Sequence, residues 1–124
     1  MNGQPLTILH VEDNTDHAQL IARSLRKNRV ANSIHHVVDG EEALDYLLLR
    51  RNYTSEELAP RPQIILLDLR LPKVDGLEVL RTIKTTDALS TIPVVVLTSS
   101  EAEKDVARAY QYRANSYLVK PVGF

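Results

Sequence analysis

The sequence predicts a single α/β domain built on a doubly wound, five-stranded parallel sheet. Five short runs rich in Val, Ile and Leu alternate along the chain with four segments of helical period. This alternation is typical of β-α-β crossovers, which build parallel sheets with helices on both faces. The length of 124 residues supports one hydrophobic core, so we expect one domain.

The predicted strands are five nearly continuous apolar runs. Such runs, unlike alternating ones, are typical of strands buried on both faces of a parallel sheet. The run SIHHVV contains two His residues and is therefore predicted to be a partly exposed edge strand. The five strands are residues 6–11, 33–38, 63–68, 93–98 and 116–120.

Four helices are predicted from apolar residues that recur every three or four positions. Three of them have an N-cap oxygen followed three residues later by Glu, at Asp39, Asp75 and Ser100. The polar stretch 50–62 has no helical period and contains two Pro residues, so we expect a long loop with one helical turn. The predicted helices cover residues 15–28, 40–51, 76–85 and 101–113. The apolar stripe of the first contains Leu20, Ile21, Ser24 and Leu25, and that of the second contains Ala43, Leu44, Leu47 and Leu48. The stripe of the third contains Leu77, Leu80 and Ile83, and that of the fourth contains Val106, Ala107 and Tyr110.

The composition excludes several classes of function. The chain has 15 Lys and Arg residues against 16 Asp and Glu residues, which leaves no basic excess for sequence-independent nucleic-acid binding. Because it has no Cys, any metal site must use oxygen or imidazole ligands. No apolar run approaches the ~18 residues that span a bilayer, and residues 1–6 do not look like a signal peptide. We therefore expect a cytoplasmic protein that binds neither membranes nor nucleic acid.

Polar side chains follow the carboxyl ends of four predicted strands, where ligands bind in open α/β sheets. Glu12 and Asp13 follow the first strand, and Asp68 ends the third. If these strands are neighbours, about 4.8 Å apart, the three carboxylates converge. Close carboxylates raise one another's pKa unless a cation lies among them, and oxygen-only ligands in a hydrated site favour Mg²⁺. Thr98 and Lys120, at the ends of the other two strands, can point to the same place.

This combination of groups fits phosphoryl transfer to a carboxylate. Asp68 is the predicted nucleophile, Mg²⁺ and Lys120 neutralise charge on the equatorial oxygens, and Thr98 donates a hydrogen bond to one of them. Neither G-x-G-x-x-G nor G-x-x-x-x-G-K-S/T occurs in the sequence, so it contains no Gly-rich nucleotide cradle. The phosphoryl group must therefore come from a partner or a small donor.

Four motifs occur in order along the chain: VED (11–13), LLDLRLPKVDG (66–76), VVVLTSS (94–100) and YLVKP (117–121). With them the sequence resembles the receiver domains of bacterial two-component response regulators, over its whole length. The resemblance implies a flavodoxin-like sheet with strand order 2-1-3-4-5.

The same resemblance implies roles for individual residues. Asp68 accepts a phosphoryl group from the histidine of a sensor kinase. Asp13 binds Mg²⁺ directly and Glu12 binds it through water, while Asp68 and the backbone carbonyl of Arg70 are further ligands.

The remaining roles belong to residues on the last two strands. Thr98 is the implied switch hydroxyl, and Tyr117 is the aromatic switch, although a Tyr on a short strand is also an ordinary half-buried residue. Lys120 is the implied phosphoryl-binding lysine, and it precedes a Pro121 that the resemblance makes cis.

The implied function is a phosphorylation-activated signalling switch, not an enzyme beyond its own phosphorylation and dephosphorylation. It changes affinity for a downstream protein through the face formed by the fourth helix and fifth strand. The long loop, the LLDLRLPKVDG motif and the lack of an output domain resemble stand-alone receivers that partner phytochrome-type histidine kinases. The chain ends at VKPVGF, where a fifth helix is expected to begin, so we read residues 1–124 as one receiver domain truncated there. The sheet surface left bare predicts either a homodimer or a poorly behaved monomer.

Three other functions remain open at this stage. A phosphatase of the haloacid dehalogenase type also uses a strand-end Asp with Mg²⁺, but it needs an acid two residues later, where this chain has Arg70. A flavodoxin-like electron carrier needs a Ser/Thr-rich loop where this chain has Glu12 and Asp13. A degenerate receiver that binds its partner constitutively is disfavoured by the complete set of polar residues.

Overall fold

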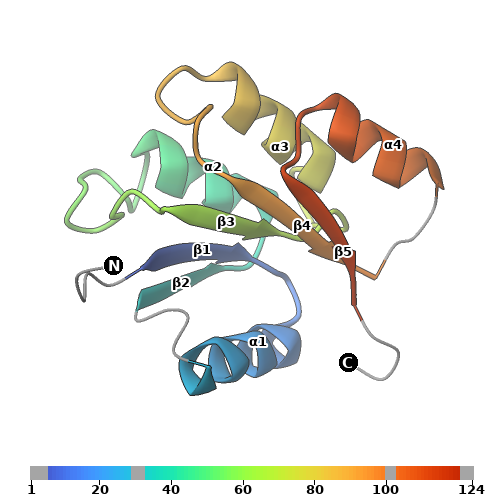
Figure 1. The fold of residues 1–124 in the computed structure, drawn as a ribbon. Coiled ribbons are helices and arrows are strands. Elements are labelled where there is room, and N and C mark those ends of the chain that lie inside the picture. Colours follow the sequence, from blue (N-terminus) through green and yellow to red (C-terminus); the bar gives the residue numbers. More distant parts are fainter. Residues whose placement is uncertain (1–5, 29–32, 100–102, 121–124) are drawn as a thin grey trace.

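The computed structural model describes residues 6–28, 33–99 and 103–120, in which strands and helices alternate (Figure 1). Every element predicted from the sequence is present, and several are shorter than predicted. No helix in these three ranges is both long and apolar enough to cross a membrane. The elements are β1 (Thr7–Val11), α1 (Thr15–Lys27), β2 (Ser33–Val37), α2 (Gly40–Leu48), β3 (Ile64–Leu67), α3 (Gly76–Thr85), β4 (Val94–Thr98), α4 (Glu103–Gln111) and β5 (Ser116–Val119).

The five strands form one parallel sheet in the order β2-β1-β3-β4-β5. This confirms the predicted flavodoxin-like fold, and β2 is the edge strand that its two His residues indicated. Val11 is in register with Leu67 across β1 and β3. Glu12 and Asp68, which follow these two residues, therefore leave the sheet side by side at the point where the strand order reverses.

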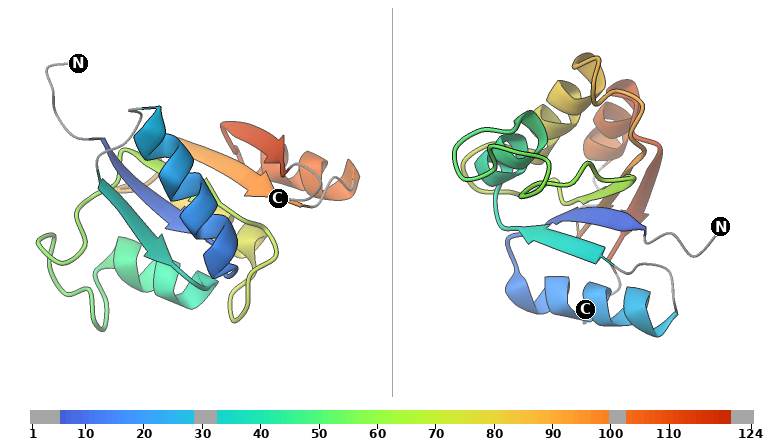
Figure 2. Two further views of the ribbon diagram at one scale, coloured as in Figure 1. Left: turned by 90° about the horizontal axis from the view of Figure 1, so that it is seen from below. Right: turned by 90° about the vertical axis from the view of Figure 1, so that its left-hand side faces the viewer.

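Helices cover the two faces of the sheet unequally. Figures 1 and 2 show that, of the helices in the described ranges, α2, α3 and α4 lie on one face and α1 lies on the other. The main hydrophobic core lies on the three-helix face, where burying each large aliphatic side chain contributes about 1.5–3 kcal/mol. The strands supply Leu9, Val11, Ile65, Leu67, Val94 and Val96 to this core, and the helices supply Ala43, Leu47, Val79, Leu80, Ile83 and Ala109.

Two of the predicted helix starts are confirmed, and they fix the loops next to the strand ends. The Asp39 side chain accepts a hydrogen bond from the backbone N–H of Glu42, and Asp75 accepts one from Leu77. Gly76, the first residue of α3, packs so closely on the β3-α3 loop that a Cβ would lie 2.4 Å from the carbonyl oxygen of Asp68. The start predicted at Ser100 lies outside the described residues, as does the expected cis Pro121.

Two apolar stripes were predicted only in part, since Ile21 and Leu25 on α1 and Val106 on α4 are half-buried but their other predicted members are exposed. On α1, Leu20 is 44% exposed and Ser24 is exposed, because this helix packs on the sheet mainly through the buried Ala18. On α4, Ala107 and Tyr110 face solvent, whereas Asp105 and Ala109 are buried. The pattern could not reveal the true face of α4 because one of its buried residues is an acid.

The loop 50–62 is correctly predicted, but it follows a shorter helix. Helix α2 ends at Leu48, and Leu49 takes a left-handed conformation with φ of 56°. The loop contains one helical turn, in which the carbonyl of Ser55 accepts from the N–H of Ala59 at 2.9 Å.

Candidate functional site

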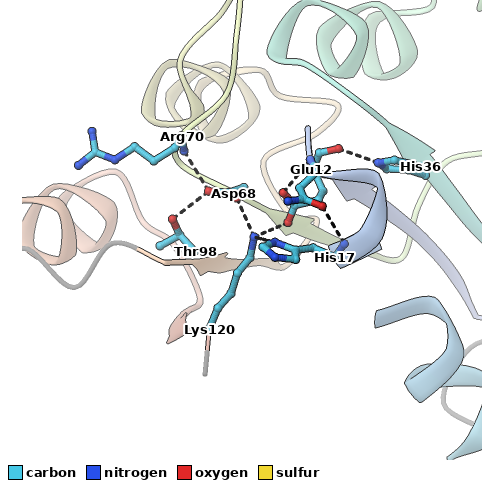
Figure 3. A network of polar contacts seen from close by, with 8 residues as sticks. Glu12, His17, His36, Asp68, Arg70, Thr98 and Lys120 are labelled. Atoms are coloured by element: carbon cyan, nitrogen blue, oxygen red, sulfur yellow. Dashed lines mark hydrogen bonds and ion pairs between the residues drawn. The ribbon is translucent and has the colours of Figure 1, made fainter. Parts of the chain in front are cut away.

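The strand-end residues predicted from the sequence meet at the carboxyl edge of the sheet (Figure 3). Glu12 follows β1, Asp68 follows β3, Thr98 ends β4 and Lys120 follows β5. All four side chains are buried, with 7% exposure or less. Four strands thus bring an ammonium, a hydroxyl and two carboxylates into one small, largely dry volume.

Lys120 is the electrostatic centre of this cluster. Its Nζ atom donates to Glu12 Oε1 at 2.5 Å and to Asp68 Oδ2 at 3.0 Å. Burial tends to lower the pKa of Lys120, but the bonds to the two carboxylates outweigh it and raise the pKa above the ordinary 10.5. The ammonium is therefore charged at neutral pH and partly neutralises the two buried carboxylates that it contacts.

The other oxygen of Asp68 is held by two further donors. Its Oδ1 atom accepts from the Thr98 hydroxyl at 2.8 Å and from the backbone N–H of Arg70 at 3.0 Å. Burial tends to raise the pKa of Asp68, but the bonds from Arg70, Lys120 and Thr98 together hold the pKa below its ordinary 3.8. Asp68 is thus an ionised, oriented carboxylate at neutral pH.

Glu12 and Asp13 join Asp68 to form an acidic cluster. One carboxylate oxygen of each lies within 4.8 Å of the other two, and Asp13 is exposed while Glu12 and Asp68 are buried. Burial raises the pKa of Glu12 above its ordinary 4.5, although Lys120 opposes the change. Three convergent carboxylates with one side open to water suit a hard divalent cation that keeps part of its hydration shell.

The predicted switch residue Tyr117 lies on β5, in register with Val96 of β4. Tyr117 is half-buried on β5 and packs against the hydrophobic core. The backbone N–H of Lys120 donates to the carbonyl of Thr98 at 2.8 Å, so the carboxyl ends of β4 and β5 are held together.

Sequence reasoning missed two residues that contact the cluster and a third that pairs with Arg70 beside it. His17 Nδ1 lies 3.1 Å from Lys120 Nζ, and His36 Nε2 lies 2.6 Å from the carbonyl oxygen of Glu12. Asp105, on α4, pairs with the guanidinium of Arg70 at 2.7 Å. The spacing of these residues in the chain gave no signal, because each contact depends on how helices and strands pack.

The comparisons with known proteins agree with this geometry. Residues 8–124 match the response regulator receiver domain family. The chain belongs to this family. The receiver domain is 48% identical over 120 residues to the probable methanogenesis regulatory protein FilR2 of Methanothrix harundinacea, which covers 97% of this chain and 75% of the relative.

The chain is also similar to phytochrome-associated response regulators, in sequence and in structure. Response regulator Rcp1 of Synechocystis is 42% identical over 119 residues, 96% of this chain and 79% of Rcp1. The crystal structure of Mn²⁺-bound Rcp1 has a TM-score of 0.89 at 41% identity and covers 97% of this chain and 84% of that one. The phosphorylated cyanobacterial phytochrome response regulator RcpA has a TM-score of 0.90 at 41% identity, with the same coverage. This receiver domain therefore resembles stand-alone, phytochrome-associated response regulators, and its acidic cluster fits a divalent metal.

Proposed function

We propose that this receiver domain is a switch that is turned on when Asp68 accepts a phosphoryl group from a histidine kinase. The proposal rests mainly on the ionisation and the hydrogen bonding of the Asp68 carboxylate. It is ionised, and Thr98, Lys120 and the backbone N–H of Arg70 all donate to it within 3.0 Å. These donors would hold the nucleophile before the reaction and the phosphoryl oxygens after it.

In the proposed reaction an oxygen of Asp68 attacks phosphorus. A new O–P bond forms, the P–N bond of the donor phosphohistidine breaks, and its electron pair stays on the imidazole nitrogen. Lys120 supplies a positive charge beside the transferred group, and the Thr98 hydroxyl turns from the carboxylate to a phosphoryl oxygen. Because both donors are already in place, little reorganisation is needed in the transition state.

We propose Mg²⁺ as the bound metal, held by Glu12, Asp13, Asp68 and the backbone carbonyl of Arg70. When bound, such an ion neutralises charge on the transferring phosphoryl group. The supporting observation is the acidic cluster, whose oxygens lie within 4.8 Å of one another. Mn²⁺-bound Rcp1 indicates that a related site takes a divalent ion.

The proposed output is a change of partner affinity at the α4-β5 face. Thr98 ends β4 and Tyr117 lies on the neighbouring strand β5, so movement of the hydroxyl toward a phosphoryl group can be followed by the ring. We propose a phytochrome-type histidine kinase as the donor, by likeness to the phytochrome response regulator RcpA. We also propose that the domain forms a homodimer.

Steady enzymatic turnover is not part of this proposal. A phosphatase of the haloacid dehalogenase type needs an acid two residues after the nucleophile to protonate the leaving group. The side chain at that position is Arg70, and its guanidinium is paired with Asp105.

The proposal is tested by intact mass after incubation with acetyl phosphate or phosphoramidate, with and without Mg²⁺. We expect a single phosphoryl adduct on the wild type that depends on Mg²⁺. The isosteric variant Asp68→Asn should form no adduct, because an amide cannot act as this nucleophile. An adduct on a well-folded Asp68→Asn variant would contradict the assignment of the acceptor.

A further inference from the structure

The side chain two residues after the proposed acceptor connects the site to helix α4. Arg70 donates through its backbone N–H to Asp68 Oδ1 at 3.0 Å. Its side chain extends away from Lys120 and Glu12 (Figure 3), and its Nη2 atom lies 2.7 Å from Asp105 Oδ2 on α4. One residue therefore contacts the acceptor through its backbone and the fourth helix through its guanidinium.

The two partners of this ion pair differ in how freely they can move. The Asp105 side chain is 9% exposed and sits in the first turn of α4, whereas the Arg70 side chain is 61% exposed. A buried carboxylate is held in place by its surroundings, while an exposed, long guanidinium can take another position at small cost. The Arg70 side chain is thus the movable member of the pair.

We propose that the Arg70–Asp105 ion pair holds α4 against the β3-α3 loop until Asp68 is phosphorylated. This inference rests on the proposed phosphorylation. A phosphoryl group puts about two negative charges on Asp68, the residue that the Arg70 backbone N–H contacts, where one carboxylate charge stood before. It competes with Asp105 for Arg70, the ion pair opens, and the start of α4 is released. Arg70 is a positioning residue that couples the state of the acceptor to α4.

The test is hydrogen exchange of the α4 amides, read by mass spectrometry with Mg²⁺, before and after addition of acetyl phosphate. In the wild type we expect α4 to exchange about fivefold faster once the adduct has formed, the change that loss of one ion pair produces. Asp105→Asn should still form the adduct. Its α4 should exchange fast already without phosphorylation and gain little from it.

Further variants separate this coupling from a merely structural role of Asp105. In Arg70→Gln, which keeps the acid in the first turn of α4, α4 should exchange fast before any phosphorylation, as in Asp105→Asn, and Arg70→Lys should restore slow exchange in the unphosphorylated state. The matched control is Glu78→Gln, which removes a first-turn acid of α3 paired with Arg81 at 2.6 Å. It should leave the α4 response unchanged.

The outcomes distinguish this inference from the proposed function. A wild-type response in both Asp105→Asn and Arg70→Gln, or an adduct on the wild type without any change in α4, would overturn the inference alone. A folded wild type that forms no adduct would overturn the proposed function and the inference together.

Discussion

Two lysines, Lys120 and Lys84, are buried at opposite ends of the sheet. The groups that they contact indicate different roles. Lys120 donates to the carboxylates of Glu12 and Asp68 at the carboxyl end. Lys84 donates to the carbonyl of Ile92 and the amide oxygen of Asn115 at the amino end, and burial, followed by Arg113, lowers its pKa. Neutral acceptors suit a structural tie between α3 and β4. Paired carboxylates around a cation suit a site whose charge changes during the reaction.

The buried side chain of His10 makes the stability of the fold depend on pH. His10 is 1% exposed, and its Nδ1 atom has no hydrogen-bond partner among the described residues. Burial, followed by the nearby His36 and Lys120, lowers the pKa of His10 from 6.5 to about 4. Between pH 4 and pH 6.5, His10 therefore binds a proton in the unfolded chain but not in the folded protein. The stability linked to His10 is complete above pH 6.5 and is lost as the pH falls toward 4.

The variant His10→Leu tests this dependence. Between pH 7 and pH 4.5 we expect the wild type to lose roughly 2 kcal/mol more unfolding free energy than the variant. The measurement is urea unfolding in EDTA at both pH values. Carboxylates that titrate in the same range are present in both proteins and largely cancel in the difference. Equal losses in the two proteins would mean that His10 takes up its proton in the folded state.

At the scale of elements, the start of α3 fixes the position of the acceptor. A Cβ on Gly76 would lie 2.4 Å from the Asp68 carbonyl oxygen and 2.5 Å from Leu69 Cα, both backbone atoms that cannot turn aside. We expect Gly76→Ala to lower stability by roughly 1–3 kcal/mol. Because the backbone of Asp68 must shift, the adduct with acetyl phosphate should also form at least about tenfold more slowly.

Gly40 provides the matched control for this prediction. A Cβ there would meet the backbone of Val74, 2.0 Å away, and not that of Asp68. Gly40→Ala should therefore lose a comparable amount of stability in chemical unfolding while forming the adduct at close to the wild-type rate. Equal slowing in both variants would show that general loosening of the fold, and not the place of the acceptor, sets the rate.

The order of the strands and the packing of the helices explain which residues of the site could be predicted from the sequence. Glu12, Asp68 and Lys120 were predictable because each follows an apolar strand, and the ends of parallel strands share one edge. Leu20 and Tyr110 were assigned to apolar stripes although both are largely exposed, since periodicity cannot tell how much of a helix the sheet covers. The pairing of Arg70 with Asp105 joins residues 35 positions apart and depends on how α4 packs. Local patterns contain no such information.

At the scale of the whole molecule, the two faces of the sheet are covered differently in the described part of the chain. Tyr117 packs into the core on the three-helix face, so alternation along β5 directs Leu118 to the other face. There Leu118 is 52% exposed, next to Leu97 on β4, while α1 packs on the β1-β2 side of the same face. An apolar edge strand with an uncovered face favours association with a second copy.

The homodimer proposed above is therefore expected to form through the β4-β5 side of the sheet. Sedimentation equilibrium of the wild type should show a dimer at high concentration, and Leu118→Lys should shift it to a monomer, because the new charge would have to be buried in the interface. Leu58→Lys is the matched control, since Leu58 is 57% exposed but lies in the loop 50–62, outside the sheet. It should leave the dimer intact. A wild type that stays monomeric would contradict this interface. Equal disruption by both variants would contradict it too, because it would show an effect of surface hydrophobicity in general and not of the β4-β5 face.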